Sequence, residues 1–212
     1  MGAGRGLFLS FEGIDGSGKS TQARALADRL RAQGRDVVLT REPGGSAGAE
    51  EIRRLLLTGD PDRWSAETEI LLFTAARRDH LERTIRPALA RGAVVVCDRF
   101  ADSTRVYQGV TRGDLRDLVD RLHALAIGVE PDLTFLIDID PATGLARATA
   151  RAGAELRFES MGLATQDRMR AAFLALAAAA PARFRVIDGA GAPADVGAAV
   201  DAALAPLLAS AP

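Results

Sequence analysis

Near its N-terminus the chain contains the run Leu7-Phe8-Leu9-Ser10-Phe11-Glu12-Gly13-Ile14-Asp15-Gly16-Ser17-Gly18-Lys19-Ser20-Thr21. Its first six residues are typical of a buried β-strand, and Thr21–Gln33 follows with the apolar spacing of an amphipathic helix. Between them, a glycine, four residues and Gly-Lys-Ser match the P-loop motif in the strand-to-helix context that it requires. Glycines let backbone N–H groups point at a phosphate, and the helix N-terminus adds partial positive charge. We therefore predict a phosphate-binding loop at Gly13–Thr21.

The side chains of this loop indicate how it holds a nucleoside triphosphate. Lys19 is the only lysine among 27 basic residues, and we expect it to bridge the β- and γ-phosphates while the Ser20 hydroxyl ligates Mg²⁺. A carboxylate at Asp15 would face the phosphates, which favours a contact with a sugar hydroxyl or a metal-bound water. The alternative is a solvated loop aspartate. The predicted ATP-binding residues are Gly13, Ile14, Asp15, Gly16, Ser17, Gly18, Lys19, Ser20 and Thr21.

Five short segments have the composition of strands. They are Leu7–Glu12, Asp36–Thr40, Ala93–Asp98, Leu133–Asp138 and Arg183–Ile187. Helical periodicity lies between them, including Asp114–Ile127 and Gln166–Ala180, and Ser65 is an expected N-cap. This alternation predicts an α/β fold of the P-loop NTPase class, a three-layer sandwich with a five-stranded parallel sheet and helices on both faces. Ligands of such sheets lie beyond the carboxyl ends of the strands.

The composition excludes several classes of protein. Of 212 residues, 48% are hydrophobic and 26% are charged, which is typical of a globular chain and excludes collagen-like and disordered sequences. We expect one domain over 1–212. A net charge of −1 and the absence of a long apolar run argue against nucleic-acid and membrane partners. Cys97, the single cysteine, is expected in the core, which fits a reducing, cytoplasmic location.

Polar residues gather where the second and third predicted strands end. Arg41-Glu42-Pro43-Gly44-Gly45 predicts a rigid turn beside the first strand. Asp98 is placed like a Walker-B acid, which holds Mg²⁺ directly or through water, and Arg99 suits a bidentate contact with phosphate. Hydrogen-bonding side chains follow at Ser103, Thr104, Tyr107 and Gln108.

Two further groups of residues each have two interpretations. Phe73 and Arg77 lie four residues apart on one helix face. In one interpretation, the Phe73 ring stacks on a base and Arg77 binds the edge of that base. In the other, Phe73 is a core residue and Arg77 is an exposed arginine beside it. Arg147, Arg151 and Arg157 lie between the fourth strand and the last long helix. They belong either to an arginine-bearing flap over the phosphates or to a solvated surface segment.

Together these motifs resemble those of the bacterial thymidylate kinases. The matching segments run in family order and at family spacing along essentially the whole chain: Phe11–Thr21, Thr40–Gly45, Asp98–Phe100, Ser103 through Tyr107-Gln108-Gly109, and Arg157-Phe158-Glu159. Many families share the P-loop, whereas Arg-Glu-Pro-Gly-Gly combined with Tyr-Gln-Gly is far more specific. The chain departs from the family at Phe100, where the family usually has a tyrosine, and at Leu156, where it often has an aspartate. The tyrosine hydroxyl and the aspartate carboxylate are therefore absent at these positions.

The resemblance implies phosphoryl transfer from ATP to dTMP with Mg²⁺, in a homodimer. It implies that Phe73 stacks on thymine, that Arg77 contacts the base edge or the nearby phosphate, and that Arg99 grips the acceptor phosphate. The implied dTMP site is Asp15, Glu42, Pro43, Phe73, Arg77, Arg99, Ser103, Thr104, Tyr107 and Gln108, with Thr104 and Gln108 at the base, Tyr107 at the sugar and Asp15 at the 3′-hydroxyl or the metal waters.

The resemblance also implies a catalytic set and a lid. The set comprises Lys19, Arg99, Arg147, Arg151 and Arg157, with Ser20 and Asp98 at the metal and 147–160 as the lid. Gly16 stands where eukaryotic-type relatives place an arginine, so the lid arginines are expected to supply that charge. The alternatives are a kinase for another deoxynucleotide or a nucleoside and, further away, a nucleotide-dependent binding switch.

Overall fold

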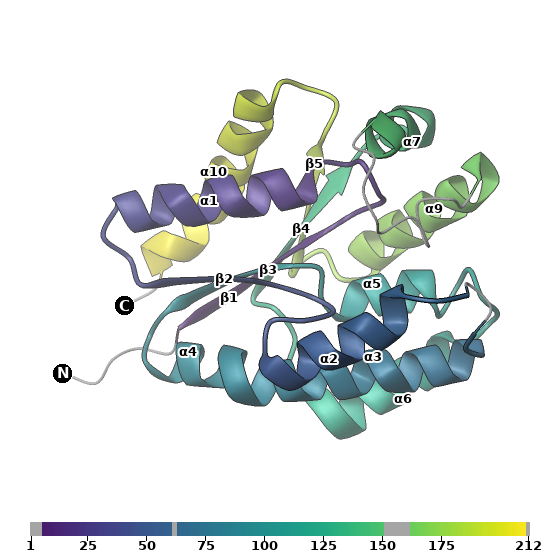
Figure 1. Cartoon of the computed structure of the whole chain (residues 1–212). Helices are drawn as coiled ribbons and strands as arrows, with labels where there is room; N and C mark the ends of the chain where they lie inside the picture. The colour runs from purple at the N-terminus through teal and green to yellow at the C-terminus, as the bar shows by residue number, and fades with distance from the viewer. Residues whose placement is uncertain (1–5, 61–62, 151–161, 211–212) are drawn as a thin grey trace.

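The computed structural model describes residues 6–60, 63–150 and 162–210, and its centre is a five-stranded, all-parallel sheet in the order β2-β3-β1-β4-β5 (Figure 1). The strands are β1 (Leu7–Glu12), β2 (Val37–Arg41), β3 (Val94–Asp98), β4 (Leu133–Asp138) and β5 (Phe184–Asp188). Each coincides with a predicted segment or is shifted from it by a single residue at either end. The predicted α/β fold with a parallel sheet is therefore confirmed.

Helices cover both faces of this sheet. They are α1 (Lys19–Ala32), α2 (Ala47–Leu57), α3 (Ala66–His80), α4 (Arg86–Ala90), α5 (Ala101–Tyr107), α6 (Arg116–Leu122), α7 (Pro141–Ala150), α9 (Leu163–Ala179) and α10 (Pro193–Ser210), with π-helical turns η1 (Leu81–Ile85) and η2 (His123–Ile127). Figure 1 shows α1 and α10 on one side of the sheet and α2, α3, α4 and α6 on the other. The segment predicted as one helix over 114–127 is instead α6 followed by the wider turn η2.

Alternation along β1 sends its side chains into two different cores, one on each face of the sheet. On β1, Leu9 and Phe11 pack with α1 and α10, whereas Phe8 packs with η1 and α4. Cys97 lies fully buried in the second core, where burial raises the pKa of its thiol, so the predicted core position is confirmed. Among the described residues, every helix is too short or too polar to cross a bilayer.

The register of the strands brings their carboxyl ends to one edge. Phe11 on β1 and Arg41 on β2 are both paired with Asp98 on β3, so the residues that follow these three positions are neighbours. The loops that carry the predicted site leave the sheet here. The prediction that polar residues after separate strands come together is thus confirmed for Asp15, Glu42 and Arg99, which line one cavity.

Glu12 joins the end of β1 to the start of α5. Its Oε1 accepts hydrogen bonds from the backbone N–H groups of Phe100 at 2.7 Å and Ser103 at 3.2 Å, and its Oε2 accepts one from the Ser103 hydroxyl at 2.6 Å. Phe100 is the N-cap of α5 and has no capping side chain of its own. The Glu12 carboxylate supplies from a neighbouring strand the acceptors that an N-cap side chain normally provides. It therefore fixes where α5 begins.

Complete burial raises the pKa of Glu12 from 4.5 to about 7, and Asp102 adds to this effect, although Ser103, Arg99 and the Phe100 N–H oppose it. Because the folded chain holds the proton more tightly, Glu12 contributes stability that is complete below pH 4.5 and is lost as the pH rises through about 7. Between about pH 5 and 8, the free energy of unfolding should fall by roughly 2–3 kcal/mol relative to that of Glu12→Gln. Urea titrations of both proteins across this range measure the difference, and parallel pH curves would contradict the prediction.

The opposite side of α5 is held by a buried ion-pair cluster. Asp102 is fully buried and lies 2.8 Å from Arg105 Nη1 and 2.6 Å from Arg183 Nη1. Arg183 directly precedes β5, so the cluster ties α5 to the far edge of the sheet. Arg105 also contacts Asp120 and Glu130, which connects α6 to the same cluster.

Neutralising Asp102 should be costly because it leaves buried guanidinium groups with too few acceptors. We expect Asp102→Asn to lower the free energy of unfolding by about 3 kcal/mol. Asp117→Asn is the matched control, since Asp117 is 85% exposed and lies 3.8 Å from Arg121, and it should change stability little. Denaturant midpoints of the two variants measure the contrast, and equal shifts would refute the structural role of the cluster.

Candidate active site

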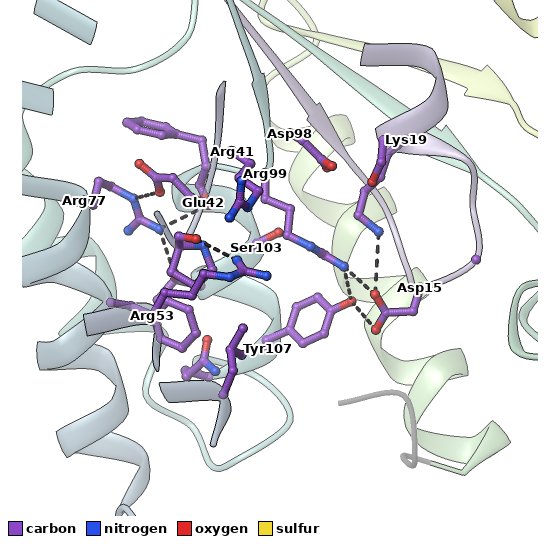
Figure 2. A pocket seen from close by; sticks show the side chains of 18 of the residues that line it. Asp15, Lys19, Arg41, Glu42, Arg53, Arg77, Asp98, Arg99, Ser103 and Tyr107 are labelled. Carbon is purple, nitrogen blue, oxygen red and sulfur yellow. Dashed lines mark hydrogen bonds and ion pairs between the residues drawn. The ribbon is translucent and has the colours of Figure 1, made fainter. Parts of the chain in front are cut away.

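A cavity of about 600 Å³ lies at the carboxyl edge of β1, β2 and β3. This volume is within the range of small-molecule sites. Figure 2 shows Lys19 and Asp15 at one side, Arg77 and Glu42 at the other, and Arg99 between them. The predicted site residues that line it are Asp15, Gly16, Gly18, Lys19, Ser20, Glu42, Pro43, Phe73, Arg77, Asp98, Arg99, Ser103, Thr104, Tyr107 and Gln108. Gly13, Ile14, Ser17, Thr21 and Arg147 do not line it.

The P-loop is bound tightly to its surroundings. Gly16 and Gly18 adopt positive φ angles of 78° and 94°, and a Cβ at Gly16 would lie 1.9 Å from the carbonyl oxygen of Gly144. Lys19 is 5% exposed and donates to the Ile14 carbonyl at 3.1 Å. Burial and the positive charge of Arg99 lower the pKa of Lys19 to about 8. An added negative group at this loop would stabilise the charged lysine.

Asp15 connects the P-loop to Arg99 and Tyr107. Its Oδ1 lies 2.5 Å from Arg99 Nη2 and 3.6 Å from Lys19 Nζ, and its Oδ2 accepts from the Tyr107 hydroxyl at 3.0 Å. Burial disfavours its charge, but Arg99 and Lys19 outweigh this effect and hold the pKa of Asp15 below its ordinary value. The side chain is 14% exposed, so the solvated alternative is wrong. Contact with a sugar or with metal waters stays a prediction.

Both the backbone conformation and the side-chain contacts of Arg99 determine where its guanidinium lies. It has φ of 70°, which is uncommon outside glycine, and its guanidinium lies over the Tyr107 ring at 4.9 Å. Its Nη1 also donates to Ser103 Oγ at 3.1 Å. Although burial opposes the charge, the neighbouring Tyr107 and Asp15 raise the pKa of Arg99, so it stays cationic. The cavity therefore contains a rigidly held positive charge.

Among the described acidic residues, Asp98 stands out because one of its carboxylate oxygens is both shielded from solvent and without a protein donor. Its Oδ1 is shielded from solvent, and no described residue donates a hydrogen bond to it. It lies in the same cavity as Ser20. Within the described ranges no three His, Cys, Asp or Glu side chains form a metal cage. Asp98 Oδ1 is an acceptor that remains available to a ligand beside Ser20.

Arg77 is a buried residue of the cavity wall. It is 3% exposed, and its Nε donates to Glu42 Oε2 at 2.6 Å while Nη2 donates to Thr104 Oγ1 at 2.9 Å and to the Phe100 carbonyl at 3.2 Å. Phe73 is only half-buried and lines the same cavity. The interpretation of a core phenylalanine beside an exposed arginine is therefore wrong, because the arginine is the more buried of the two.

Gln108 is held by an acidic neighbour. Its Nε2 faces Glu69 Oε2 at 3.4 Å, and Glu69 is itself fully buried and paired with Arg112 at 3.2 Å. Because a carboxylate only accepts, this contact assigns the amide nitrogen to the Glu69 side and the amide oxygen to the other side. The orientation of the Gln108 amide is thereby fixed.

Sequence reasoning missed the contribution of α2. Arg53 and Leu57 of this helix line the cavity, and Arg53 Nη1 donates to the Pro43 carbonyl at 2.7 Å. The available signal was the amphipathic spacing of 47–57 directly after the Arg-Glu-Pro-Gly-Gly turn. Of the predicted flap residues, Arg147 donates to the Gly189 carbonyl at 3.1 Å, and Arg151 and Arg157 lie outside the described residues.

Comparisons with known proteins agree with this geometry. The family model described as thymidylate kinase matches residues 11–200. A thymidylate kinase of Ruegeria pomeroyi is 75% identical over 88% of this chain and 89% of that protein, and one of Caulobacter vibrioides is 59% identical over 87% and 88%. The crystal structure of thymidylate kinase from Ehrlichia chaffeensis superposes with a TM-score of 0.77 at 36% identity, over 95% of this chain and 99% of that one. The chain belongs to the thymidylate kinase family.

Proposed function

We propose that the chain, a thymidylate kinase that phosphorylates dTMP, binds ATP at Gly13–Thr21 and dTMP between α3 and α5. The observation that carries this assignment is that one cavity has Lys19 at one side and the Arg77–Glu42 pair at the other, with Arg99 between them. A phosphate donor at Lys19 and a nucleotide held at Arg77 would meet beside Arg99.

The reaction needs no side-chain nucleophile. A phosphate oxygen of dTMP forms a bond to the γ-phosphorus of ATP while the bond from that phosphorus to the β–γ bridging oxygen breaks, giving dTDP and ADP. Catalysis is then positioning plus stabilisation of charge. Lys19 stabilises the charge that develops on the bridging oxygen, and Arg99 orients the acceptor phosphate. Both side chains are held by Asp15, which supports their preorganised placement.

The acceptor nucleotide is recognised by Phe73, Arg77, Thr104 and Gln108. A half-buried ring at Phe73 suits stacking on thymine. The Gln108 amide oxygen, which is turned away from Glu69, suits the N3–H donor of thymine, and cytosine has no proton at that position. Glu42, Pro43 and Ser103 complete the predicted site.

A bound Mg²⁺ would neutralise charge on the transferred phosphoryl group. We propose Ser20 Oγ and Asp98 Oδ1 as the groups that hold it directly or through water. The unpaired, shielded Oδ1 of Asp98 supports this assignment.

We further propose that 1–212 form a single nucleoside monophosphate kinase domain with 147–160 as the lid, in which Arg147, Arg151 and Arg157 contribute charge. We infer a homodimer, supported by Leu71 of α3 and Leu125 of η2, which are 55% and 84% exposed on elements that contact each other. A cytoplasmic location fits a single buried cysteine and the two nucleotide substrates.

Lys19→Met tests the phosphate assignment. Loss of the ammonium group should lower kcat by about 100-fold or more, because a preorganised charge in a water-poor site stabilises the transition state strongly. The dTMP dissociation constant should stay close to that of the unmodified chain, because dTMP binds at the other side of the cavity. Stopped assays of dTDP formation and calorimetric titration with dTMP give both quantities. Near-normal turnover would place the triphosphate elsewhere.

Tyr107 is proposed to select the deoxy sugar. A ribose hydroxyl pushed against its ring would lose water without gaining a partner, which gives about 5- to 150-fold preference for dTMP over ribothymidine monophosphate. Tyr107→Ala should reduce this ratio of kcat/KM values, whereas Tyr107→Phe keeps the ring and should keep the ratio. Because Tyr107 packs against Phe173, alanine also costs stability, but the ratio does not depend on the folded fraction. An unchanged ratio in Tyr107→Ala would reject steric selection.

A further inference from the structure

We propose that His80 is a positioning residue of the acceptor site: its Nδ1–H holds the Glu42 carboxylate in the orientation that aligns the Arg77 guanidinium. The role extends the proposed function, since it rests on the assignment of Arg77 to dTMP binding. His80 is the last residue of α3 and does not line the cavity, so it acts only through Glu42.

The two oxygens of Glu42 are divided between two residues of α3. Oε2 accepts from Arg77 Nε at 2.6 Å, and Oε1 lies 3.0 Å from His80 Nδ1. Positions 77 and 80 are three residues apart and therefore share a helix face. All three side chains are at most 5% exposed, and His80 is fully buried. With both oxygens engaged, the carboxylate cannot rotate without leaving one of the two donors unpaired.

The other side of the imidazole ring is equally constrained. Nε2 lies 2.7 Å from Thr40 Oγ1 on β2, and a Cβ at Gly45 would lie 2.4 Å from Nε2. A carboxylate can only accept, so Nδ1 carries a proton and Nε2 shares the remaining hydrogen bond with the Thr40 hydroxyl. The ring therefore connects β2 and the glycine turn to the end of α3, and turning it over would break both of its hydrogen bonds.

The consequence reaches the cavity through Arg77. Its Nε is used by Glu42 and its Nη2 by Thr104 and Phe100, and no described residue accepts a hydrogen bond from Nη1. Nη1 is thus the part of the guanidinium left for a ligand. If Glu42 were free to rotate, the Arg77 guanidinium would lose the hydrogen bond that fixes its Nε. The bound nucleotide would then have to orient the guanidinium itself, which lowers its affinity.

Two substitutions of His80 separate positioning from packing. In His80→Asn the amide nitrogen takes a place close to that of Nδ1 and can donate to Glu42, whereas in His80→Gln it reaches toward Thr40, where Nε2 lay. We expect His80→Gln to raise KM and Kd for dTMP about tenfold with KM for ATP unchanged, and His80→Asn to stay within about twofold of the unmodified chain. KM does not depend on the concentration of folded enzyme, so partial misfolding does not obscure the comparison.

His123→Gln is the matched control. His123 is the other histidine of the chain, is 7% exposed and contacts Glu130 at 3.2 Å, away from Glu42. It should lower thermal stability without changing KM for dTMP. If His80→Gln and His80→Asn raised KM for dTMP equally, or if His123→Gln raised it as much as His80→Gln, the positioning role would be overturned.

A double-mutant cycle and one site variant complete the test. If His80 acts through Glu42, His80→Gln should add little to the rise in KM caused by Glu42→Gln, and additive effects would overturn the proposal. Arg77→Gln tests the site itself. An unchanged KM for dTMP in that variant would reject the assignment of Arg77, whereas a raised KM with no effect of His80→Gln would reject only the role of His80.

Discussion

The Glu12 carboxylate, at the end of β1, connects the register of the sheet to the position of the cavity. Parallel pairing places the ends of β1, β2 and β3 side by side, but it does not by itself determine how the chain continues after β3. Glu12 does so by accepting three hydrogen bonds from Phe100 and Ser103. α5 therefore starts at one defined place, with Thr104, Tyr107 and Gln108 facing the cavity and Asp102 facing the ion-pair cluster behind it.

Two of the arginines that line the cavity, Arg77 and Arg99, are each held by a carboxylate of their own. Asp15 contacts Arg99 and Glu42 contacts Arg77, and in both cases a further donor, Tyr107 or His80, engages the second carboxylate oxygen. Anchoring of this kind fixes the guanidinium groups before substrate arrives, so little orientational freedom is lost on binding. It also keeps Arg99 and Lys19 close together, because Asp15 lies between two positive charges that would otherwise repel each other.

The sequence was sufficient wherever the signal was local. Strand positions, the P-loop and the Ser65 N-cap, whose side chain accepts from the Thr68 N–H, all follow from neighbouring residues. Burial of Arg77 did not, because its partner Glu42 lies 35 residues away and the pairing appears only when β2 and α3 meet. Arg53 was missed for a related reason, since the position of α2 depends on the turn that precedes it. The capping role of Glu12 likewise joins residues 88 and 91 positions apart.

Gly16 shows how the backbone limits where catalytic charge can reside. A Cβ there would meet the Gly144 carbonyl at 1.9 Å, and this is a contact with backbone rather than with a side chain that can move aside. Since φ is also positive, no charged side chain fits at this point of the P-loop. Charge beyond that of Lys19 must therefore reach the transferred group from another element. In the arrangement proposed above, Arg99 would supply it from the end of β3. The close approach of Gly144 places α7 directly against the P-loop. The same contact that excludes a side chain at Gly16 thus brings α7, which carries Arg147, next to the P-loop.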